Sequence, residues 1–287
     1  RYYSARLNTD YTLGYERGSD KPGSNGGISI EGKEPDEWNN SVFDALIEYG
    51  NSDSHGQLVG RIIYEEWRYT NNDSEFRDYN QVGATGTFYY RLAPRTRLLF
   101  ELDYDDNDYQ ESDIFGNNQS NKEYSYLTGL TWEATAKTSG VFKIGYRDKK
   151  YQNNSFSDIT GLALFLDGTW KPTTHTKVSF GASRDNENSA IQGSGGSTKT
   201  GIDAGLEHGI TQRLMLTSSI RLSEEDFDGA FSRKDDRRYF ALGVKYSLQP
   251  RFDIGIEYQF EERDSNLNLF DFTSNILILT ASTRFQK

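Results

Sequence analysis

The chain has 287 residues, of which 34% are hydrophobic and 14% aromatic, with no cysteine and a formal net charge of -11. The acidic balance argues against nucleic-acid binding, which needs a basic surface, and no run of about 18 apolar residues is present to form a membrane-spanning helix. The mean hydropathy of -0.78 would suit a very soluble or disordered chain, yet the aromatic content argues against disorder. A transmembrane β-barrel reconciles these values, because only alternate residues of each strand face lipid.

The first part of the chain predicts three strands. The first covers roughly residues 3–17, and a loop that contains glycine and proline follows to about Asn39. In the second strand apolar side chains recur at every second position up to Tyr49. The third strand follows a turn at residues 51–56 and has apolar residues on both faces, so its phase stays open: Leu58, Ile62 and Tyr64 share one face, and Val59, Ile63 and Trp67 the other.

Residues 82–104 show a hairpin most clearly. Apolar residues from Val82 to Leu92 alternate with polar or small ones, and the alternation resumes after the turn at residues 93–96 as far as Tyr104. Side chains at period two lie on opposite faces of a strand. The hairpin therefore has one apolar face and one charged face.

Near-copies of this hairpin recur at a regular spacing. One ring residue precedes each short turn at intervals of 42, 38, 38 and 38 residues: Tyr90, Trp132, Trp170, His208 and Tyr246. Pro94, Pro172 and Pro250 fall in alternate turns, 78 residues apart, and proline fits strand ends and turns but not the inside of a ladder. The repeat predicts consecutive antiparallel hairpins of one sheet.

The complete pattern predicts about fourteen strands of about ten residues each. The loops alternate between short and long, which is typical of bacterial outer-membrane barrels with short periplasmic turns and longer outer loops. The expected fold class is therefore all-β: a single closed antiparallel transmembrane β-barrel that forms one domain over residues 1–287. A soluble sandwich or solenoid is the structural alternative, and the heavily charged mid-strand positions argue against it.

Aromatic residues near the strand ends predict two membrane-interface girdles, where a ring with a polar tip lies at headgroup level. The candidate girdle residues are Tyr15, Tyr49, Tyr64, Tyr90, Tyr104, Trp132, Tyr146, Trp170, Tyr246 and Tyr258. Cross-strand aromatic residues also occur in sheets of other kinds.

The charged face of the strands predicts the lining of a water-filled pore. The candidate pore-lining residues are Arg6, Arg61, Arg91, Arg97, Glu101, Asp103, Glu133, Lys143, Arg147, Asp167, Lys177, Asp203, Arg213, Arg221, Lys245, Asp253, Glu257 and Arg284. Opposite charges on neighbouring strands can pair across the ladder. Since the two signs nearly cancel, strong ion selectivity is not expected.

No catalytic, metal or cofactor site is expected. The acidic loops, for example residues 105–113 and 224–228, suit either a divalent-cation site that bridges to lipopolysaccharide or solvated charges, and the second interpretation is favoured. His55, His175 and His208 all fall in or beside short turns, where an ordinary turn or interface role is favoured over catalysis.

Three hairpins carry a resemblance to a known family: Leu130-Thr131-Trp132 to Tyr146-Arg147-Asp148, Gly168 to Asp185, and Gly243 to Asp264. They resemble the family described as putative β-barrel porin type 2, which includes outer-membrane proteins found beside exopolysaccharide operons. The resemblance implies a bacterial outer-membrane location and a porin-like channel or conduit, for example for export of surface polysaccharide. A non-conducting docking barrel that anchors a larger envelope assembly is the alternative. The expected partners are outer-membrane lipid and lipopolysaccharide, with polysaccharide or an envelope secretion complex as further candidates and no nucleic acid.

Overall fold

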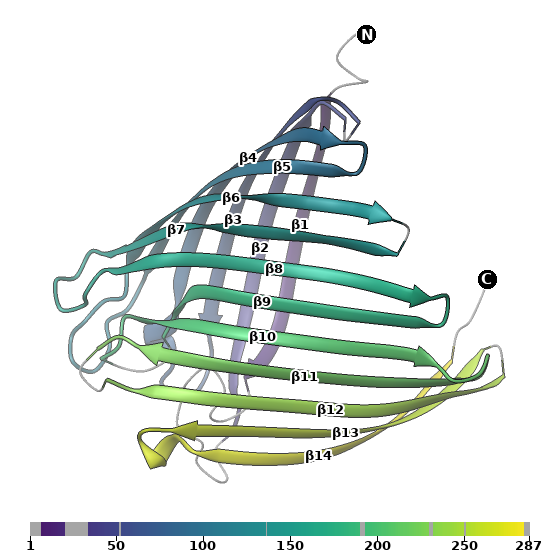
Figure 1. Ribbon diagram of the computed structural model, residues 1–287. Coiled ribbons are helices and arrows are strands. Elements are labelled where there is room, and N and C mark those ends of the chain that lie inside the picture. Colours follow the sequence, from purple (N-terminus) through teal and green to yellow (C-terminus); the bar gives the residue numbers. More distant parts are fainter. Residues whose placement is uncertain are drawn as a thin grey trace.

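The computed structural model describes residues 7–20, 34–51, 53–135, 137–189, 193–229, 232–249 and 251–283. Fourteen antiparallel strands form one sheet in which each strand pairs with the next one in the chain (Figure 1). The strands are β1 (Leu7–Asp20), β2 (Asp36–Tyr49), β3 (Gly56–Tyr69), β4 (Tyr79–Ala93), β5 (Thr96–Tyr109), β6 (Asn121–Thr135), β7 (Thr138–Tyr151), β8 (Ile159–Thr173), β9 (Thr176–Asn188), β10 (Gly196–Gly209), β11 (Leu214–Phe227), β12 (Lys234–Gln249), β13 (Phe252–Ser265) and β14 (Phe272–Thr283). The predicted fourteen-stranded antiparallel sheet is confirmed.

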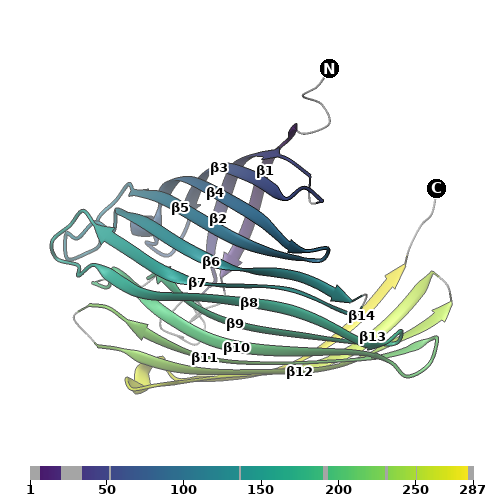
Figure 2. The ribbon, with the colours of Figure 1, turned by 45° about the horizontal axis from the view of Figure 1, so that its top comes forward.

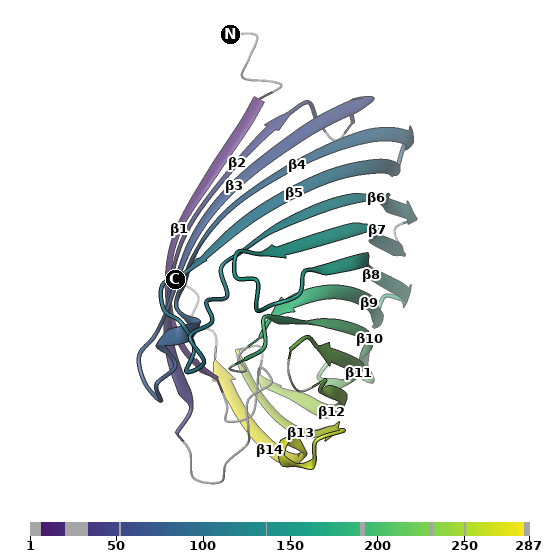
Figure 3. The ribbon, with the colours of Figure 1, turned by 90° about the vertical axis from the view of Figure 1, so that its left-hand side faces the viewer.

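The sheet is strongly curved, with one concave and one convex face (Figures 2 and 3). Its strand order begins at β1 and ends at β14, and among the described residues these two edge strands are not paired with each other. The predicted closure of the sheet is therefore not shown by the strand pairing.

The connections alternate between the two ends of the sheet. Two residues join β4 to β5, β6 to β7, β8 to β9 and β12 to β13, at the end that we call the turn end. Longer connections, such as residues 110–120 between β5 and β6, gather at the opposite end, the loop end. Two short 3₁₀ helices, η2 (Glu75–Arg77) and η3 (Asn268–Phe270), lie in loop-end connections. Within the described ranges, no helix has the length and apolarity needed to cross a membrane.

The strands are longer than the sequence pattern predicts, with 12 to 16 residues instead of about ten. β2 begins at Asp36, within the segment expected to be loop, and residues 105–109 and 224–227 continue β5 and β11. The reason is that ladder hydrogen bonds join main-chain groups and need no apolar side chain. Lys122 beside Asp106, at 3.4 Å, also offsets the charge that made this stretch resemble a loop.

Burial is distributed in the opposite way to a soluble protein. The structure decides which side chains of β3 share a face with the apolar positions of its neighbours. Leu58 and Ile62 are exposed on the convex face, while Trp67 lies on the concave one. Charged side chains such as Lys149, Asp235 and Arg263 are almost completely buried. An apolar exposed face opposite a polar buried one argues against a soluble sandwich, since lipid is the medium that favours such an exterior.

Candidate functional site

The convex face carries every candidate girdle residue. One row lies toward the turn end and comprises Tyr49, Tyr90, Trp132, Trp170 and Tyr246. The other lies toward the loop end and comprises Tyr15, Tyr64, Tyr104, Tyr146 and Tyr258. Exposed aliphatic side chains such as Leu102, Ile256 and Leu279 lie on the same face. Their contact with the membrane interface stays a prediction.

The concave face carries the candidate pore-lining residues that occupy described strands. Strand alternation places them opposite to the exposed apolar positions: Arg61, Arg91, Arg97, Glu101, Asp103, Glu133, Lys143, Arg147, Asp167, Lys177, Asp203, Arg221, Lys245, Asp253 and Glu257. Arg213 lies in the turn that precedes β11 and not in a strand. Arg6 and Arg284 lie outside the described residues. That these side chains line a pore stays a prediction.

Many concave side chains are joined in ion pairs. Lys143 Nζ lies 2.6 Å from Glu101 Oε1, and Lys245 Nζ lies 2.8 Å from Asp253 Oδ2. Arg147 binds Asp185, which reaches from β7 to β9 across the intervening β8. Side chains on the inside of a curved sheet converge, so such contacts identify the concave face as the inner one. The pairs leave this wall polar, with charges of both signs in contact.

Three loop-end connections meet across the concave face. Gln119 Nε2 donates to the carbonyl oxygens of Ser194 (2.8 Å) and Ser189 (3.2 Å). The backbone N–H of Gly193 donates to Asp113 Oδ2 at 2.8 Å. Ser194 Oγ donates to the Asp228 carbonyl oxygen at 2.5 Å, so the loops that follow β5, β9 and β11 are tied together. This arrangement narrows the loop end of the interior.

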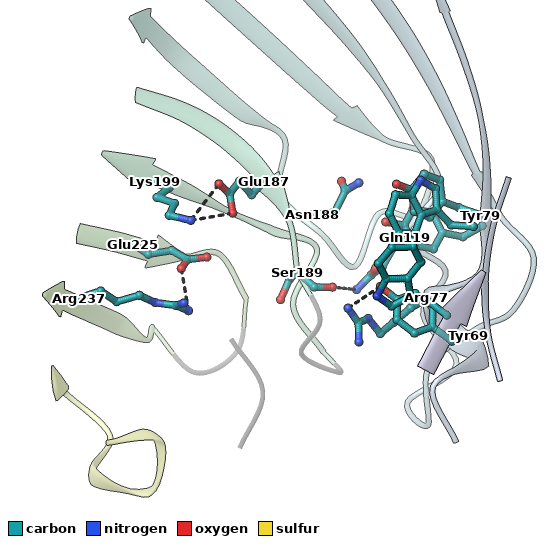
Figure 4. A pocket seen from close by; sticks show the side chains of 13 residues that line it. Tyr69, Arg77, Tyr79, Gln119, Glu187, Asn188, Ser189, Lys199, Glu225 and Arg237 are labelled. Carbon is teal, nitrogen blue, oxygen red and sulfur yellow. Dashed lines mark hydrogen bonds and ion pairs between the residues drawn. The ribbon is translucent and has the colours of Figure 1, made fainter. Parts of the chain in front are cut away.

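Beneath these loops lies a cavity of about 230 Å³ (Figure 4). Its lining comes from β2 to β5 on one side and from β9 to β12 on the other: Trp38, Trp67, Tyr69, Arg77, Tyr79, Tyr109, Gln119, Glu187, Asn188, Ser189, Lys199, Glu225 and Arg237. None of these residues is among the sequence candidates. The strand alternation offered one signal for these residues. Trp38, Tyr79 and Tyr109 are aromatic, yet the residues two positions away on the same face of each strand are mostly polar.

The short connection that carries η2 supports one side of this cavity. The Arg77 guanidinium lies 3.9 Å from the centre of the Tyr69 ring and donates to the Tyr69 hydroxyl at 2.7 Å. Asp78 Oδ1 accepts the Tyr69 backbone N–H at 2.7 Å. Partial burial raises the pKa of the Asp78 carboxyl above its ordinary value.

The histidines lie at the turn end, away from this cavity. His175 Nδ1 is 2.8 Å from the Thr174 hydroxyl, and His208 Nδ1 is 2.9 Å from the Thr176 hydroxyl. Within the described part of the chain, no group of three or more His, Cys, Asp or Glu residues is arranged to hold a metal ion.

Comparison with known proteins gives one family and several fold relatives. A family model described as putative beta-barrel porin 2 matches residues 54–285. No curated protein matches the chain.

Solved outer-membrane proteins share the fold at low sequence identity. The copper transporter OprC is 12% identical with a TM-score of 0.59, over 94% of this chain and 52% of its own. The FrpB iron transporter from Neisseria meningitidis (F3-3 variant) is 10% identical with a TM-score of 0.55, over 90% of this chain and 50% of its own. The outer membrane channel DcaP of Acinetobacter baumannii is 15% identical with a TM-score of 0.52, over 98% of both chains. This chain therefore spans about half the length of the two transporters.

Proposed function

Since the chain belongs to the putative beta-barrel porin 2 family and is a protein of the bacterial outer membrane, we propose that its sheet closes into a barrel that conducts hydrophilic solutes. The observation that carries this proposal is the contrast between the two faces. The convex face exposes aliphatic and aromatic side chains, whereas the concave face holds charged groups at mid-strand, such as Glu101 and Lys143. A polar interior inside an apolar exterior is the design of a water-filled barrel.

Closure would join β1 to β14. β1 runs toward the loop end and β14 runs toward the turn end, so the two edges have the antiparallel directions that closure requires. Unpaired amides at an edge are costly in lipid, which favours closure in the membrane. The chain has no cysteine of its own, so any disulfide within it must join two introduced cysteines. Single cysteines at Tyr11 or Leu13, combined with one at Leu277 or Leu279, should form a disulfide in membranes, whereas the absence of any crosslink would contradict closure.

Conduction is tested by single-channel recording of the folded protein in a planar bilayer, with polymers of graded size added to both sides. We expect steady conductance that small polymers reduce and large ones do not. Absence of conductance from protein that is folded and inserted would contradict the conduit. The outer-membrane channel DcaP, which matches along nearly its whole length, supports conduction as the first test.

Surface polysaccharide is the cargo that we propose. Support comes from the hairpin resemblance to proteins found beside exopolysaccharide operons and from the ion pairs that join charges of both signs on the concave face. A neutral or mixed-charge wall suits a hydroxyl-rich polymer better than a strongly charged ion. Release of polymer from cells that lack the protein, compared with complemented cells, measures this part of the proposal.

A docking barrel is the second candidate, and the tied loops favour it because they narrow the loop end. Asp113→Ala removes the carboxylate that holds Gly193, while Glu111→Ala removes an exposed charge from the same loop as a control. A conduit gated by these loops predicts larger or noisier currents for Asp113→Ala than for Glu111→Ala. No current from either variant, with both folded, would favour the docking role.

A further inference from the structure

A row of aromatic rings crosses four neighbouring strands at the loop end of the concave face. The ring centroid of Trp67 lies 4.7 Å from that of Trp38 and 6.3 Å from that of Tyr79, and Tyr79 is 5.1 Å from Tyr109. The register places Trp67 opposite Tyr79 and Tyr79 opposite Tyr109, so the row runs from β2 to β5. Trp67 Nε1 donates to Glu65 Oε2 at 2.8 Å, which orients the indole.

These rings lie on the polar side of the sheet, so a membrane-interface role does not explain them. Tyr109 is buried beneath the loops, but Trp38, Trp67 and Tyr79 are only half-buried and border the cavity. Ring surface that faces an aqueous interior is a typical feature of a ligand-binding surface. We call the four residues the ring row.

The opposite side of the same cavity is polar. Lys199 Nζ lies 3.2 Å from Glu187 Oε1, and Arg237 Nη2 lies 3.3 Å from Glu225 Oε2, with both pairs directed toward the cavity (Figure 4). Asn188 lies beside Glu187 on the same strand. This side therefore offers donors and acceptors in alternation, with little net charge.

Two buried groups beside the cavity have unused hydrogen-bonding capacity. Gln119 is 2% exposed, and its Oε1 atom has no hydrogen-bond partner among the described residues. Arg237 Nε and Nη2 likewise make no hydrogen bond there, although Glu225 is close enough for an ion pair. Buried polar atoms without partners cost free energy, so hydroxyl groups of a bound molecule would be favourable partners.

We propose that this cavity is a saccharide-binding site of the conduit, a proposal that rests on the proposed function and assigns its substrate class. A pyranose ring has an apolar C–H face, which can lie against an aromatic ring, and a rim of hydroxyls that both donate and accept hydrogen bonds. The ring row offers a surface for the apolar face. The hydroxyl rim finds donors and acceptors on Glu187, Lys199, Glu225 and Arg237, on the opposite side of the cavity, and on Gln119 beside it. The row extends beyond one ring, so the ligand is an oligosaccharide or a polymer segment.

Other ligand classes use only part of this geometry. An inorganic ion would leave the ring row without a partner, and a flat aromatic compound would leave the paired charges and Gln119 Oε1 unmatched. Because the cations and carboxylates of the cavity are paired, a neutral saccharide fits better than a highly charged one.

The test measures binding separately from conduction. The four tryptophans divide into two on the concave face, Trp38 and Trp67, and two on the convex face, Trp132 and Trp170. Replacing Trp132 and Trp170 with phenylalanine leaves tryptophan fluorescence from Trp38 and Trp67 alone, both of which border the cavity. Maltohexaose, cellohexaose and chitohexaose are then titrated against the refolded protein, with affinity confirmed by calorimetry. We expect a saturable change in emission with at least one of the three sugars.

Variants distinguish stacking from a merely structural role. Trp67→Ala should weaken binding about tenfold, Trp67→Phe should retain most of it, and Trp170→Ala on the convex face should leave it unchanged. Folding is verified for each variant by the difference in gel mobility between heated and unheated samples. Equal affinity of wild type and folded Trp67→Ala, or no binding of any of the three sugars, would overturn the proposal.

Failure of the conduit is distinguishable from failure of the saccharide site. Conductance without sugar binding would support the conduit and contradict the saccharide site. Sugar binding without conductance would support the saccharide site and contradict the conduit.

Discussion

The two sides of the loop-end cavity use the same cross-strand geometry for different chemistry. On β2 to β5, neighbouring positions hold the contacting rings of the ring row. On β9 to β12, neighbours on adjacent strands hold ion pairs instead, Glu187 with Lys199 and Glu225 with Arg237. We call these two pairs, together with Arg233 and Asp235 at the start of β12, the ion-pair wall. The difference shows that alternation fixes the face on which a residue lies, while cross-strand partners decide what that face can bind.

The two sides also differ in how their stability should respond to mutation. Removing one ring leaves a smaller contact surface, whereas removing one charge can leave its partner buried and unpaired. The second loss is the larger one wherever water cannot reach the remaining charge. Mutation should therefore cost most where the ion-pair wall is most buried, less in the strands between the two sides, and least at an exposed pair.

The largest effect is expected at Asp235. Its side chain is fully buried, binds Arg233 and lies 3.9 Å from Arg263 Nε. Asp235→Ala would leave two buried guanidinium groups without this carboxylate, so the free energy of unfolding should fall by about 3–5 kcal/mol. Urea unfolding in detergent micelles measures the change.

Asp236 provides a matched control for this prediction, since it is the same residue type at the next position and is exposed on the other face. Asp236→Ala should change the free energy of unfolding by less than about 0.5 kcal/mol. Similar losses for the two variants would contradict the assignment of Asp235 to the buried wall.

An intermediate loss of stability is expected in β6 and β7, which lie between the ring row and the ion-pair wall. A Cβ atom on Gly129 would lie 1.9 Å from the Phe142 carbonyl oxygen, and one on Gly145 would lie 1.9 Å from that of Tyr126. The obstacle is main chain, which cannot rotate away as a side chain can. Gly129→Ala should therefore lower the free energy of unfolding by about 1–3 kcal/mol.

Gly161, in β8, is the control because nothing lies within 4 Å of a Cβ atom built there. Gly161→Ala should leave stability unchanged or raise it by up to about 1 kcal/mol, since alanine restricts the unfolded chain. Equal tolerance at Gly129 and Gly161, measured by the same urea titration, would contradict the close approach of β6 and β7.

Sequence reasoning predicted the strand number and the convex face because both follow from the alternation of apolar residues. Leu98, Phe100 and Leu102 indicate a lipid-facing side without any knowledge of their neighbours. Strand ends were predicted less well, as in residues 105–108, because the ladder continues through main-chain hydrogen bonds where every side chain is polar. Closure involves the two strands most distant in sequence, so no local pattern reports it.

The ring row was missed for a related reason. Trp67 was noticed but its face stayed undecided, and Tyr79 and Tyr109 fall in predicted loop or turn segments. Their proximity depends on the register between β3, β4 and β5, which places residues 12 and 30 positions apart side by side. Aromatic residues out of phase with the apolar face are the signal that a sequence alone could have offered.

The smallest effect is expected for an exposed ion pair near the turn end of the concave face. Lys177 Nζ lies 2.9 Å from Glu207 Oε1, with side chains that are 44% and 49% exposed. A double-mutant cycle with Lys177→Ala and Glu207→Ala should give a coupling free energy below about 1 kcal/mol, and salt should reduce it further, because water screens the pair. This measurement reports on the interior as well as on the pair. A coupling of several kcal/mol that is insensitive to salt would mean that the concave face is dry at this depth, and a dry interior is incompatible with a water-filled conduit.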